Sequence, residues 1–465
     1  MIDLERLSRD EVGALTPWLL LQQVFSVLLA ADKSYAAVEI RKPVNDRGMN
    51  ANWVSQYRAA RFKSVEGDVN SWRSEAAQIA SSNMDAAAID SPFFQLTLPT
   101  GLGKTLIALD CALRLRARLQ KTAIGERTII YALPFLTILE QAAEVYDQLF
   151  ATALDCDLED LPSELMIRHH HLAEMRYVHE EREFNPNQSQ LMIEGWRAAL
   201  VMTSTVQLFQ SLFSGRNRTS RKLHRLAGAI VILDEIQSIP FKYWPLLNKV
   251  MRALNTLFDT RFILVTATQP RFLEMGHGGE KAVELVPSYR AYFERLNRTR
   301  TRCDLTPRSI ESFAKLVEAT LRSAHSGEDA LVIVNTVNAA VALFDLLSPE
   351  FSEDYEVVHL STNIVPFERG SRISKIRHRR EQTRPTLVIS TQLVEAGVDL
   401  SFPVLFRDFA PFSSIVQAAG RANRNGEYIS GGQVYVCKLV NDQGKSMASG
   451  IYDAIELNAT EAVFN

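Results

Sequence analysis

The sequence has little that would place the protein in a membrane or outside the cell. Only four cysteines occur among 465 residues, none in Cys-x-x-Cys spacing, so neither a disulfide framework nor a cysteine zinc site is expected. No apolar run reaches the roughly 18 residues that a spanning helix needs. The first residues lack a basic start followed by an apolar stretch, so no secretion signal is predicted. We therefore expect a cytoplasmic protein.

Charge of one sign is also not in excess. The formal net charge is −3, so the protein as a whole is not a basic nucleic-acid coat, and any nucleic-acid site must be local. Basic residues do cluster in 216–225 and 369–384. A charge run is more often a solvated face than a binding site, so these runs alone identify no partner.

Histidine is scarce too, and the first of nine is His169. It begins the cluster His169-His170-His171, which invites a metal interpretation. Consecutive histidines rarely give one ion good geometry. We expect a polar loop at this position, without a metal.

What the sequence does contain is an alternation of strand-forming runs with helical segments. Residues 11–32 and 52–80 have helical periodicity only. From about Phe93, short β-branched runs are each followed by a helical segment, which predicts parallel strands joined by helices in an α/β fold. The expected strands are Phe94–Leu98, Thr128–Leu133, Ala199–Thr203, Ala229–Leu233, Phe262–Thr266, Ala330–Asn335, Glu356–Leu360, Thr386–Ser390, Val404–Asp408 and Gln433–Leu439.

The strands fall into two series. Between them lies Arg295–Arg302, a basic stretch without apolar periodicity that we interpret as the linker. The expected organisation is a helical segment over 1–90 and two α/β domains over 91–297 and 298–465. Two such lobes leave a cleft in which ligands bind at the carboxyl ends of the strands.

A phosphate loop is predicted where the first strand ends. Leu98–Thr105 reads LPTGLGKT and precedes a predicted helix over Leu106–Leu119, which is the context such a loop requires. Glycines let backbone N–H groups approach phosphates, and the helix N-terminus adds positive charge. Lys104 is expected to reach the β- and γ-phosphates, and the Thr105 hydroxyl to ligate magnesium. Leu98 replaces the usual first glycine, which relaxes the match. The expected nucleotide contacts are Pro99, Thr100, Gly101, Leu102, Gly103, Lys104 and Thr105.

Two carboxylates follow the apolar run Ala229–Leu233. Asp234 is expected to hold magnesium, Glu235 to orient the attacking water, and Gln237 to sense the nucleotide. The plainer alternative is an acidic cap on a following helix, because Asp caps helices well. The phosphate loop upstream favours the catalytic interpretation. Thr266-Ala267-Thr268 follows the next strand, and we expect Thr266 and Thr268 to couple the carboxylates to bound nucleic acid.

The second lobe contributes two further motifs. Ile389–Asp399 follows a strand and offers hydroxyls, an amide and a carboxylate to the cleft. Gln417–Arg424 places Arg421 and Arg424 three residues apart, so that on a helix they would share a face. Arginine matches phosphate geometry and stabilises charge that develops on a transferred phosphoryl group. Supplied from the opposite lobe, these arginines would complete the site only on closure, which couples hydrolysis to motion.

Together these segments resemble superfamily 2 helicases and, more narrowly, the CRISPR-associated helicase of type I systems. The resemblance extends from about Phe93 to Val440. It rests on whole phrases: Leu96–Thr105, Tyr131–Gln141, Asp234–Pro240, Ser390–Leu400, Asp408–Pro411 and Gln417–Arg424.

The resemblance implies two tandem RecA-like parallel-sheet domains after an N-terminal helical segment. It also implies ATP- and Mg²⁺-dependent 3′–5′ movement on single-stranded DNA, once a guide-RNA surveillance complex has opened its target. By analogy the catalytic residues are Glu235, Gln237, Gln417, Arg421 and Arg424, with nucleotide contacts from Gly397 and Asp399. The DNA backbone contacts would be Pro134, Thr203, Ser204, Thr336 and Thr391, which carry little sequence information, as suits a motor.

The sequence departs from many family members at both ends. They begin with a metal-dependent nuclease domain built on a His-Asp pair, but no His-Asp dipeptide occurs here. Val24–Lys33 looks like the last helix of that domain. We therefore expect DNA cutting by a separate subunit or domain. Many members also carry a C-terminal accessory domain, whereas this sequence ends at Asn465.

Two alternatives remain open from the sequence. One is an RNA helicase of the same superfamily. The other is a nucleotide-gated module that recruits a nuclease without unwinding.

Overall fold

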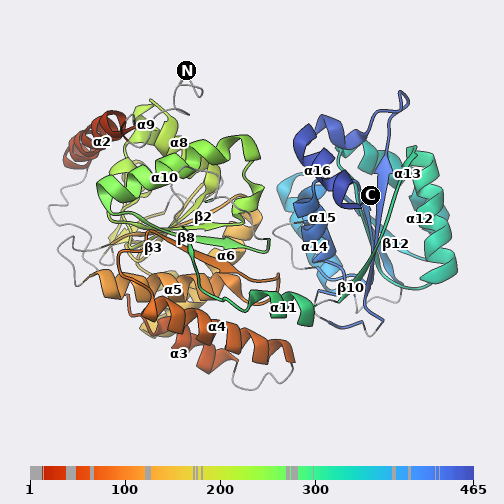
Figure 1. Ribbon diagram of the computed structural model, residues 1–465, viewed down its shortest axis with the longest axis horizontal. Coiled ribbons are helices and arrows are strands. Elements are labelled where there is room, and N and C mark those ends of the chain that lie inside the picture. Colours follow the sequence, from red (N-terminus) through yellow and green to blue (C-terminus); the bar gives the residue numbers. More distant parts are fainter. Residues whose placement is uncertain are drawn as a thin grey trace. The chain divides into compact units, whose positions relative to one another are not determined.

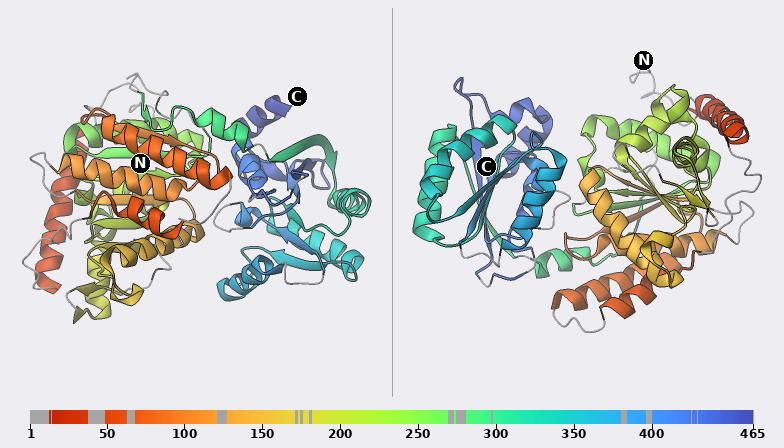
Figure 2. Two further views of the ribbon diagram at one scale, coloured as in Figure 1. Left: turned by 90° about the horizontal axis from the view of Figure 1, so that it is seen from below. Right: turned by 180° about the vertical axis from the view of Figure 1, so that it is seen from behind.

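The chain forms two compact units, Met1–Arg295 and Leu296–Asn465, drawn in Figures 1 and 2. The structure is a computed structural model. It describes residues 13, 15–37, 49–62, 68–120, 127–170, 173, 176–179, 182–268, 273, 281–296, 298–379, 384–395, 400–424, 426–428 and 430–464. Within these residues no helix is both long and apolar enough to cross a membrane.

The first unit is built on a seven-stranded parallel sheet in the order β3-β6-β2-β7-β8-β1-β9. Its central strands are buried on both faces, as apolar strands of parallel sheets are. The strands are β1 (Phe93–Thr97), β2 (Ile129–Leu133), β3 (Met166–His169), β6 (Leu200–Ser204), β7 (Ile230–Asp234), β8 (Arg261–Thr266) and β9 (Val283–Glu284); a separate antiparallel pair is β4 (Val178–His179) and β5 (Arg182–Glu183).

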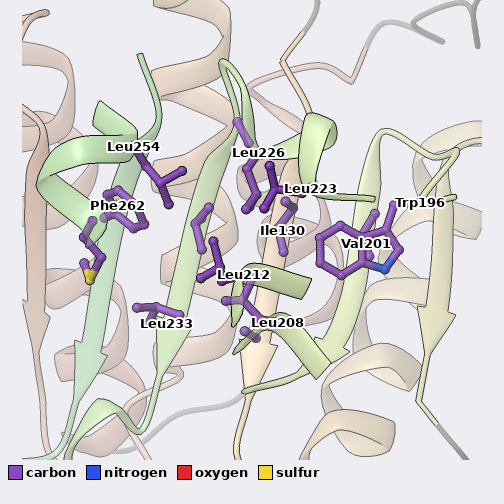
Figure 3. Close-up of a cluster of buried hydrophobic side chains, with 14 of the residues drawn as sticks. Ile130, Trp196, Val201, Leu208, Leu212, Leu223, Leu226, Leu233, Leu254 and Phe262 are labelled. Carbon is purple, nitrogen blue, oxygen red and sulfur yellow. The ribbon is translucent and has the colours of Figure 1, made fainter. Parts of the chain in front are cut away.

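Helices cover both faces of this sheet (Figure 1). On one side lie α3 (Trp53–Arg61), α4 (Asp68–Ala86) and α5 (Lys104–Leu119), and on the other α8 (Thr205–Phe213) and α10 (Trp244–Phe258). The remaining helices are α2 (Thr16–Ala37), α6 (Leu136–Leu154), α7 (Pro186–Glu194), α9 (Asn217–Ser220) and α11 (Tyr289–Arg295). Figure 3 shows the apolar core on the α8 and α10 side, where Leu208, Leu212 and Leu254 meet Leu233 and Phe262 of the sheet.

The second unit has a six-stranded parallel sheet in the order β10-β15-β14-β11-β13-β12. Its strands are β10 (Thr299–Arg308), β11 (Ala330–Ile333), β12 (Glu356–Leu360), β13 (Thr386–Ser390), β14 (Val404–Asp408) and β15 (Gly432–Leu439). One core lies under α12 (Ile310–Ala324) and α13 (Val337–Phe351). The other lies under α14 (Pro366–Arg377), α15 (Phe412–Ala419) and α16 (Ala454–Phe464), on the opposite face (Figure 1).

The predicted fold class is confirmed: the chain forms two α/β units, and the N-terminal helices are part of the first unit. Each of the ten expected strands is present within about two residues of its predicted bounds. The prediction succeeded because buried parallel strands appear in the sequence as continuous apolar runs, whereas the helices between them show amphipathic periodicity.

The linker prediction, Arg295–Arg302, was wrong at its far end. Thr299 already begins β10, and only residues 296–298 separate that strand from α11. The run shows no apolar periodicity because β10 is an edge strand, paired with β15 among the described strands, and most of its side chains are exposed. The short or marginal strands β3 and β9 were also not predicted.

Candidate functional site

The phosphate loop follows β1 and ends at α5, as the sequence predicted. Gly101 and Gly103 have φ values of 87° and 77°, a backbone region that side chains disfavour and glycine tolerates. Gly103 is the residue that precedes α5. Lys104 is buried, and its Nζ donates to the Leu98 carbonyl at 3.1 Å. The ammonium is therefore held against the loop whose backbone would surround a phosphate.

The N-terminal helices contact this loop directly. Arg73 of α4 donates from Nε to the Gly101 carbonyl at 2.7 Å, and Arg58 of α3 donates to the Arg73 carbonyl at 3.0 Å. Helix α4 therefore supports the phosphate loop through Arg73.

Asp234 ends β7 and is buried, with 6% of its surface exposed. Its Oδ2 accepts a hydrogen bond of 2.6 Å from the Tyr131 hydroxyl, and its Oδ1 accepts from the Glu235 backbone N–H at 2.9 Å. Burial, and then the Glu235 carboxylate, raise the pKa of Asp234 to about 6, while the Lys104 charge lowers it. Such a carboxylate gains from a bound cation, because the cation compensates the cost of burying the charge.

Two tyrosines link the proposed magnesium ligands, and sequence reasoning missed both. Tyr131 donates to Asp234, whereas Tyr146 donates to the Thr105 carbonyl at 2.8 Å. Their rings pack edge to face with centroids 5.6 Å apart. The available signal was Tyr131 itself, a hydroxyl inside the otherwise apolar buried strand β2.

Glu235, Gln237 and Thr266 come together at the carboxyl ends of the paired strands β7 and β8. Gln237 donates to the Glu235 carboxylate, and its Oε1 accepts from the Thr266 hydroxyl at 2.8 Å. Thr268 donates its backbone N–H to Thr266 Oγ1 at 2.9 Å. Glu235 has a φ of 52°, a strained value for a residue with a side chain and one that clusters at functional sites. The predicted catalytic and coupling residues of the first unit thus form one connected group.

The residues of the first unit that were predicted to contact the DNA backbone lie at the same sheet edge. Pro134 follows β2, and β2 pairs with β6 so that Leu133 is opposite Ser204. Ser204 caps α8 by accepting from Gln207 N–H at 3.1 Å. The Thr203 side chain is fully buried and donates to the His169 carbonyl at 2.9 Å, so its hydroxyl faces the interior of the unit.

The expectation of a polar loop at the histidine cluster was wrong. His169 ends β3, is buried, and accepts at Nδ1 from Trp196 Nε1 at 2.9 Å. Burial and then the nearby Lys222 charge lower the pKa of His169 to about 2. His170 is also buried and contacts Glu140, while His171 lies outside the described residues. In the part of the chain that the structure describes, no cluster of His, Cys, Asp and Glu is arranged to hold a metal ion.

In the second unit, Thr336 and Thr391 follow β11 and β13. Thr336 caps α13 by accepting from Ala339 N–H at 3.1 Å, and Thr391 is buried. Both lie at the carboxyl edge of neighbouring strands. Gly397 and Asp399 lie outside the described residues.

Arg421 and Arg424 do not share a helix face, contrary to the prediction. Helix α15 carries Gln417 but ends at Ala419, because Gly420 follows and Asn423 adopts a left-handed φ of 50°. Arg421 is 6% exposed and donates from Nη2 to the Glu395 carbonyl at 2.9 Å. Its Nε and Nη1 have no hydrogen-bond partner among the described residues.

A buried polar cluster that sequence reasoning missed surrounds Arg407 of β14. Its guanidinium lies 2.7 Å from the Glu395 carboxylate, donates to Asn335 Oδ1 at 2.7 Å and donates to the Tyr452 hydroxyl at 3.1 Å. Burial raises the pKa of Glu395, and the Arg407 charge opposes that rise.

The same cluster supports each predicted functional segment of the second unit. Gln392, next to Thr391, donates to the Asn335 carbonyl at 2.9 Å. Asn335 precedes Thr336, and Glu395 holds Arg421 through its carbonyl. We therefore treat this as one set, the Arg407 cluster: Asn335, Gln392, Glu395, Arg407, Asp408 and Tyr452.

Two α/β units, the first with a phosphate loop and an Asp-Glu pair at its strand ends, form an arrangement similar to that of superfamily 2 helicases. The sequence matches the DEAD/DEAH box helicase model over residues 74–275 and the C-terminal model of the CRISPR-associated nuclease/helicase Cas3 over residues 326–427. The chain is thus related through both units to the Cas3 helicases, which confirms the resemblance predicted from the sequence.

Individual relatives agree with these matches. The CRISPR-associated nuclease/helicase Cas3 of Haloferax volcanii is 31% identical over 75% of this chain and 46% of its own length. That of Methanothermobacter thermautotrophicus is 27% identical over 79% and 42%. The chain therefore spans about half the length of the curated relatives it matches.

Solved structures show the same fold. The T. fusca Cas3–AMPPNP structure has a TM-score of 0.64 at 18% identity, over 83% of this chain and 49% of that one. A chain of a CRISPR RNA-guided surveillance complex, pre-nicking, has a TM-score of 0.53 at 18% identity, over 81% and 46%.

Proposed function

We propose that the chain is an ATP-dependent helicase or translocase that moves 3′ to 5′ on single-stranded DNA during type I CRISPR interference. The observation that carries this proposal is the connected group at the edge of the first sheet, which runs from Asp234 through Glu235 and Gln237 to Thr266. It joins a nucleotide site to the strand ends that would face nucleic acid. The similarity to Cas3 proteins supports the CRISPR context.

ATP would bind at the phosphate loop, with Pro99–Thr105 around its phosphates. The residues fit a magnesium ion, because a hydroxyl at Thr105 and a buried carboxylate at Asp234 are the oxygen ligands that Mg²⁺ prefers. The ion would neutralise charge on the phosphates. Lys104 would leave the Leu98 carbonyl for a phosphate oxygen, and Glu235, oriented by Gln237, would hold the attacking water.

From the second unit, the Arg421 guanidinium would stabilise the negative charge on the transferred phosphoryl group. Two nitrogens of that guanidinium, Nε and Nη1, have no described partner, which suits this role because a buried donor without an acceptor is costly. Gln417 and Arg424 would share this catalytic role, and Gly397 and Asp399 would contact the nucleotide. The single-stranded DNA would be contacted by the hydroxyls of Ser204, Thr336 and Thr391 and by the backbone at Pro134. Thr203 would contribute through its position, because its hydroxyl is used internally.

The test is unwinding of a short DNA duplex with a single-stranded tail. We expect ATP-dependent displacement of duplexes with a 3′ tail and none with a 5′ tail. Lys104→Ala should abolish displacement, whereas Lys281→Ala, at an exposed lysine of the same unit, should leave it unchanged. Equal activity on either tail would overturn the stated direction.

Two alternatives have distinct results in this assay. Stronger displacement of RNA than of DNA strands would indicate an RNA helicase. ATP-dependent binding to a guide-RNA surveillance complex without any displacement would indicate a recruiting module. We further propose that the DNA is cut by a nuclease on another chain or domain, which predicts that this chain alone leaves single-stranded DNA intact with Mg²⁺ and ATP.

A further inference from the structure

One aromatic side chain of the second unit is exposed almost completely. Phe367, at the start of α14, is 90% exposed, and Val365 two residues before it is 64% exposed. An apolar ring in water forgoes the stabilisation that burial would give it. Single exposed residues are common on proteins, so the surroundings of Phe367 decide whether it has a function.

Its position is at the edge where strand contacts are proposed. Helix α14 begins at Pro366, six residues after Leu360 ends β12. Strand β12 pairs with β13 so that Leu360 is opposite Ser390, and Thr391 donates its N–H to the Leu360 carbonyl at 3.2 Å. Phe367 thus belongs to the segment that leaves the sheet directly beside Thr391.

The charge of α14 suits an anion. The helix carries Arg369, Arg372, Lys375 and Arg377 against a single carboxylate, Glu368. Arg372 pairs with Glu368 at 2.9 Å, and Lys375 pairs with Glu356. Arg369 and Arg377 form no ion pair with another described residue. The exposed ring therefore lies at the start of a helix that carries an excess of positive charge.

We propose that Phe367 is a stacking platform for a base of the single strand, next to the backbone that Thr391 holds. This proposal rests on the proposed motor function and adds a contact to the bases. Every base has a π-face, so such stacking is independent of sequence, as a motor requires. Arg369, two residues further on, points to another side of the helix, so the basic residues of α14 would attract the strand through their summed charge.

A protein partner fits this surface less well. Protein interfaces need about 1,000 Å² of complementary surface, whereas the strongly exposed apolar residues described in this segment are Phe367 and Val365, beside cations. An exposed flat ring on a basic helix suits a base of a negatively charged single strand. Protein docking at Phe367 is an outcome that the test below separates.

The test compares binding of a fluorescent single-stranded DNA to the full chain and to Phe367→Ala. We expect binding to weaken about 5- to 150-fold, which corresponds to ~1–3 kcal/mol for one stacked base. Phe367→Trp should restore it. Ile455→Ala, which removes a 67% exposed apolar side chain of α16 in the same unit, should bind as the unmodified chain does.

A second measurement does not depend on loss of binding. All five tryptophans lie in the first unit, so Phe367→Trp gives the second unit its only indole. Its fluorescence should be quenched by a single strand, and that of Ile455→Trp should not. Unchanged affinity in Phe367→Ala together with no quenching would overturn the proposal. So would unchanged strand affinity with lost binding to a surveillance complex, which would identify a protein-docking residue.

The two proposals fail in different ways. If the unmodified chain binds no single strand and no strand stimulates its ATP hydrolysis, the motor function itself is wrong. If the unmodified chain is stimulated and Phe367→Ala binds equally well, only the stacking role is wrong.

Discussion

The two units present their proposed functional groups in different ways. In the first unit, the groups lie at strand ends: the loop after β1, Asp234 at the end of β7 and Thr266 at the end of β8. In the second unit, the buried Arg407 cluster holds Arg421 and the neighbours of Thr336 and Thr391. The groups of the first unit can therefore be recognised from local sequence patterns, whereas those of the second unit depend on residues that are distant in sequence.

The largest expected effect comes from breaking the ion pair at the centre of the Arg407 cluster. Arg407→Met would leave the Glu395 carboxylate buried without its cation. Such a change lowers the free energy of unfolding by about 3–5 kcal/mol. We expect the second unit to unfold at a lower urea concentration. Because all five tryptophans lie in the first unit, their fluorescence should report unchanged unfolding while circular dichroism reports the loss.

The matched variant is Arg407→Met combined with Glu395→Met. Replacing both members of a buried pair by apolar groups is often neutral, so stability should largely return while strand stimulation of ATP hydrolysis stays low. Full return of stimulation would contradict a positioning role of the cluster.

The next effect concerns the first unit. Lys104→Ala removes a cation from the phosphate site, and loss of one such group costs on the order of 10²–10³-fold in kcat. Stability should change little, because the one hydrogen bond described for the Lys104 ammonium is that to the Leu98 carbonyl. Steady-state ATP hydrolysis measures the first quantity, and a thermal melt the second; Lys281→Ala is the control.

A smaller effect is expected from Tyr131→Phe. It removes a hydrogen bond to the Asp234 carboxylate and keeps the ring packing with Tyr146. Hydrogen bonds to charged groups contribute roughly 1.5–3 kcal/mol, so the Mg²⁺ concentration for half-maximal ATP hydrolysis should change by about tenfold. Tyr146→Phe also keeps its ring and loses only the hydroxyl that donates to the Thr105 carbonyl, so an equal change in that variant would show that the effect is not specific to the Asp234 contact.

The smallest effect is on the pH dependence of stability in the first unit. The pKa of folded His169 is about 2, below its ordinary value of about 6.5. The unfolded chain therefore takes up a proton that the folded chain does not, and stability is lost as pH falls below about 6.5. A difference of one bound proton changes the free energy of unfolding by ~1.4 kcal/mol per pH unit.

His169→Asn tests this slope, because an amide oxygen can replace Nδ1 as the acceptor for Trp196 without titrating. Urea unfolding followed by tryptophan fluorescence at pH 7, 6 and 5 should show a shallower loss in the variant. Identical slopes would assign the acid sensitivity to other groups.

The sequence was sufficient for the buried strands and for Leu98–Thr105 and Asp234, since each depends on neighbours in the chain. It could not place the Tyr131 hydroxyl within hydrogen-bond distance of Asp234, because that contact depends on the pairing of β2 with β7, in which Tyr131 is opposite Ile232. The helix assumed for Arg421 and Arg424 failed because spacing alone does not show where a helix ends. Thr203 illustrates the same limit, since a hydroxyl at a strand end can face inward.

The most direct test of the central claim is ATP hydrolysis titrated with single-stranded DNA. The account predicts that the unmodified chain is stimulated, that Asp234→Ala is inactive at every DNA concentration, and that Lys281→Ala behaves as the unmodified chain. An unmodified chain whose hydrolysis no single strand stimulates, whether DNA or RNA, would contradict the account.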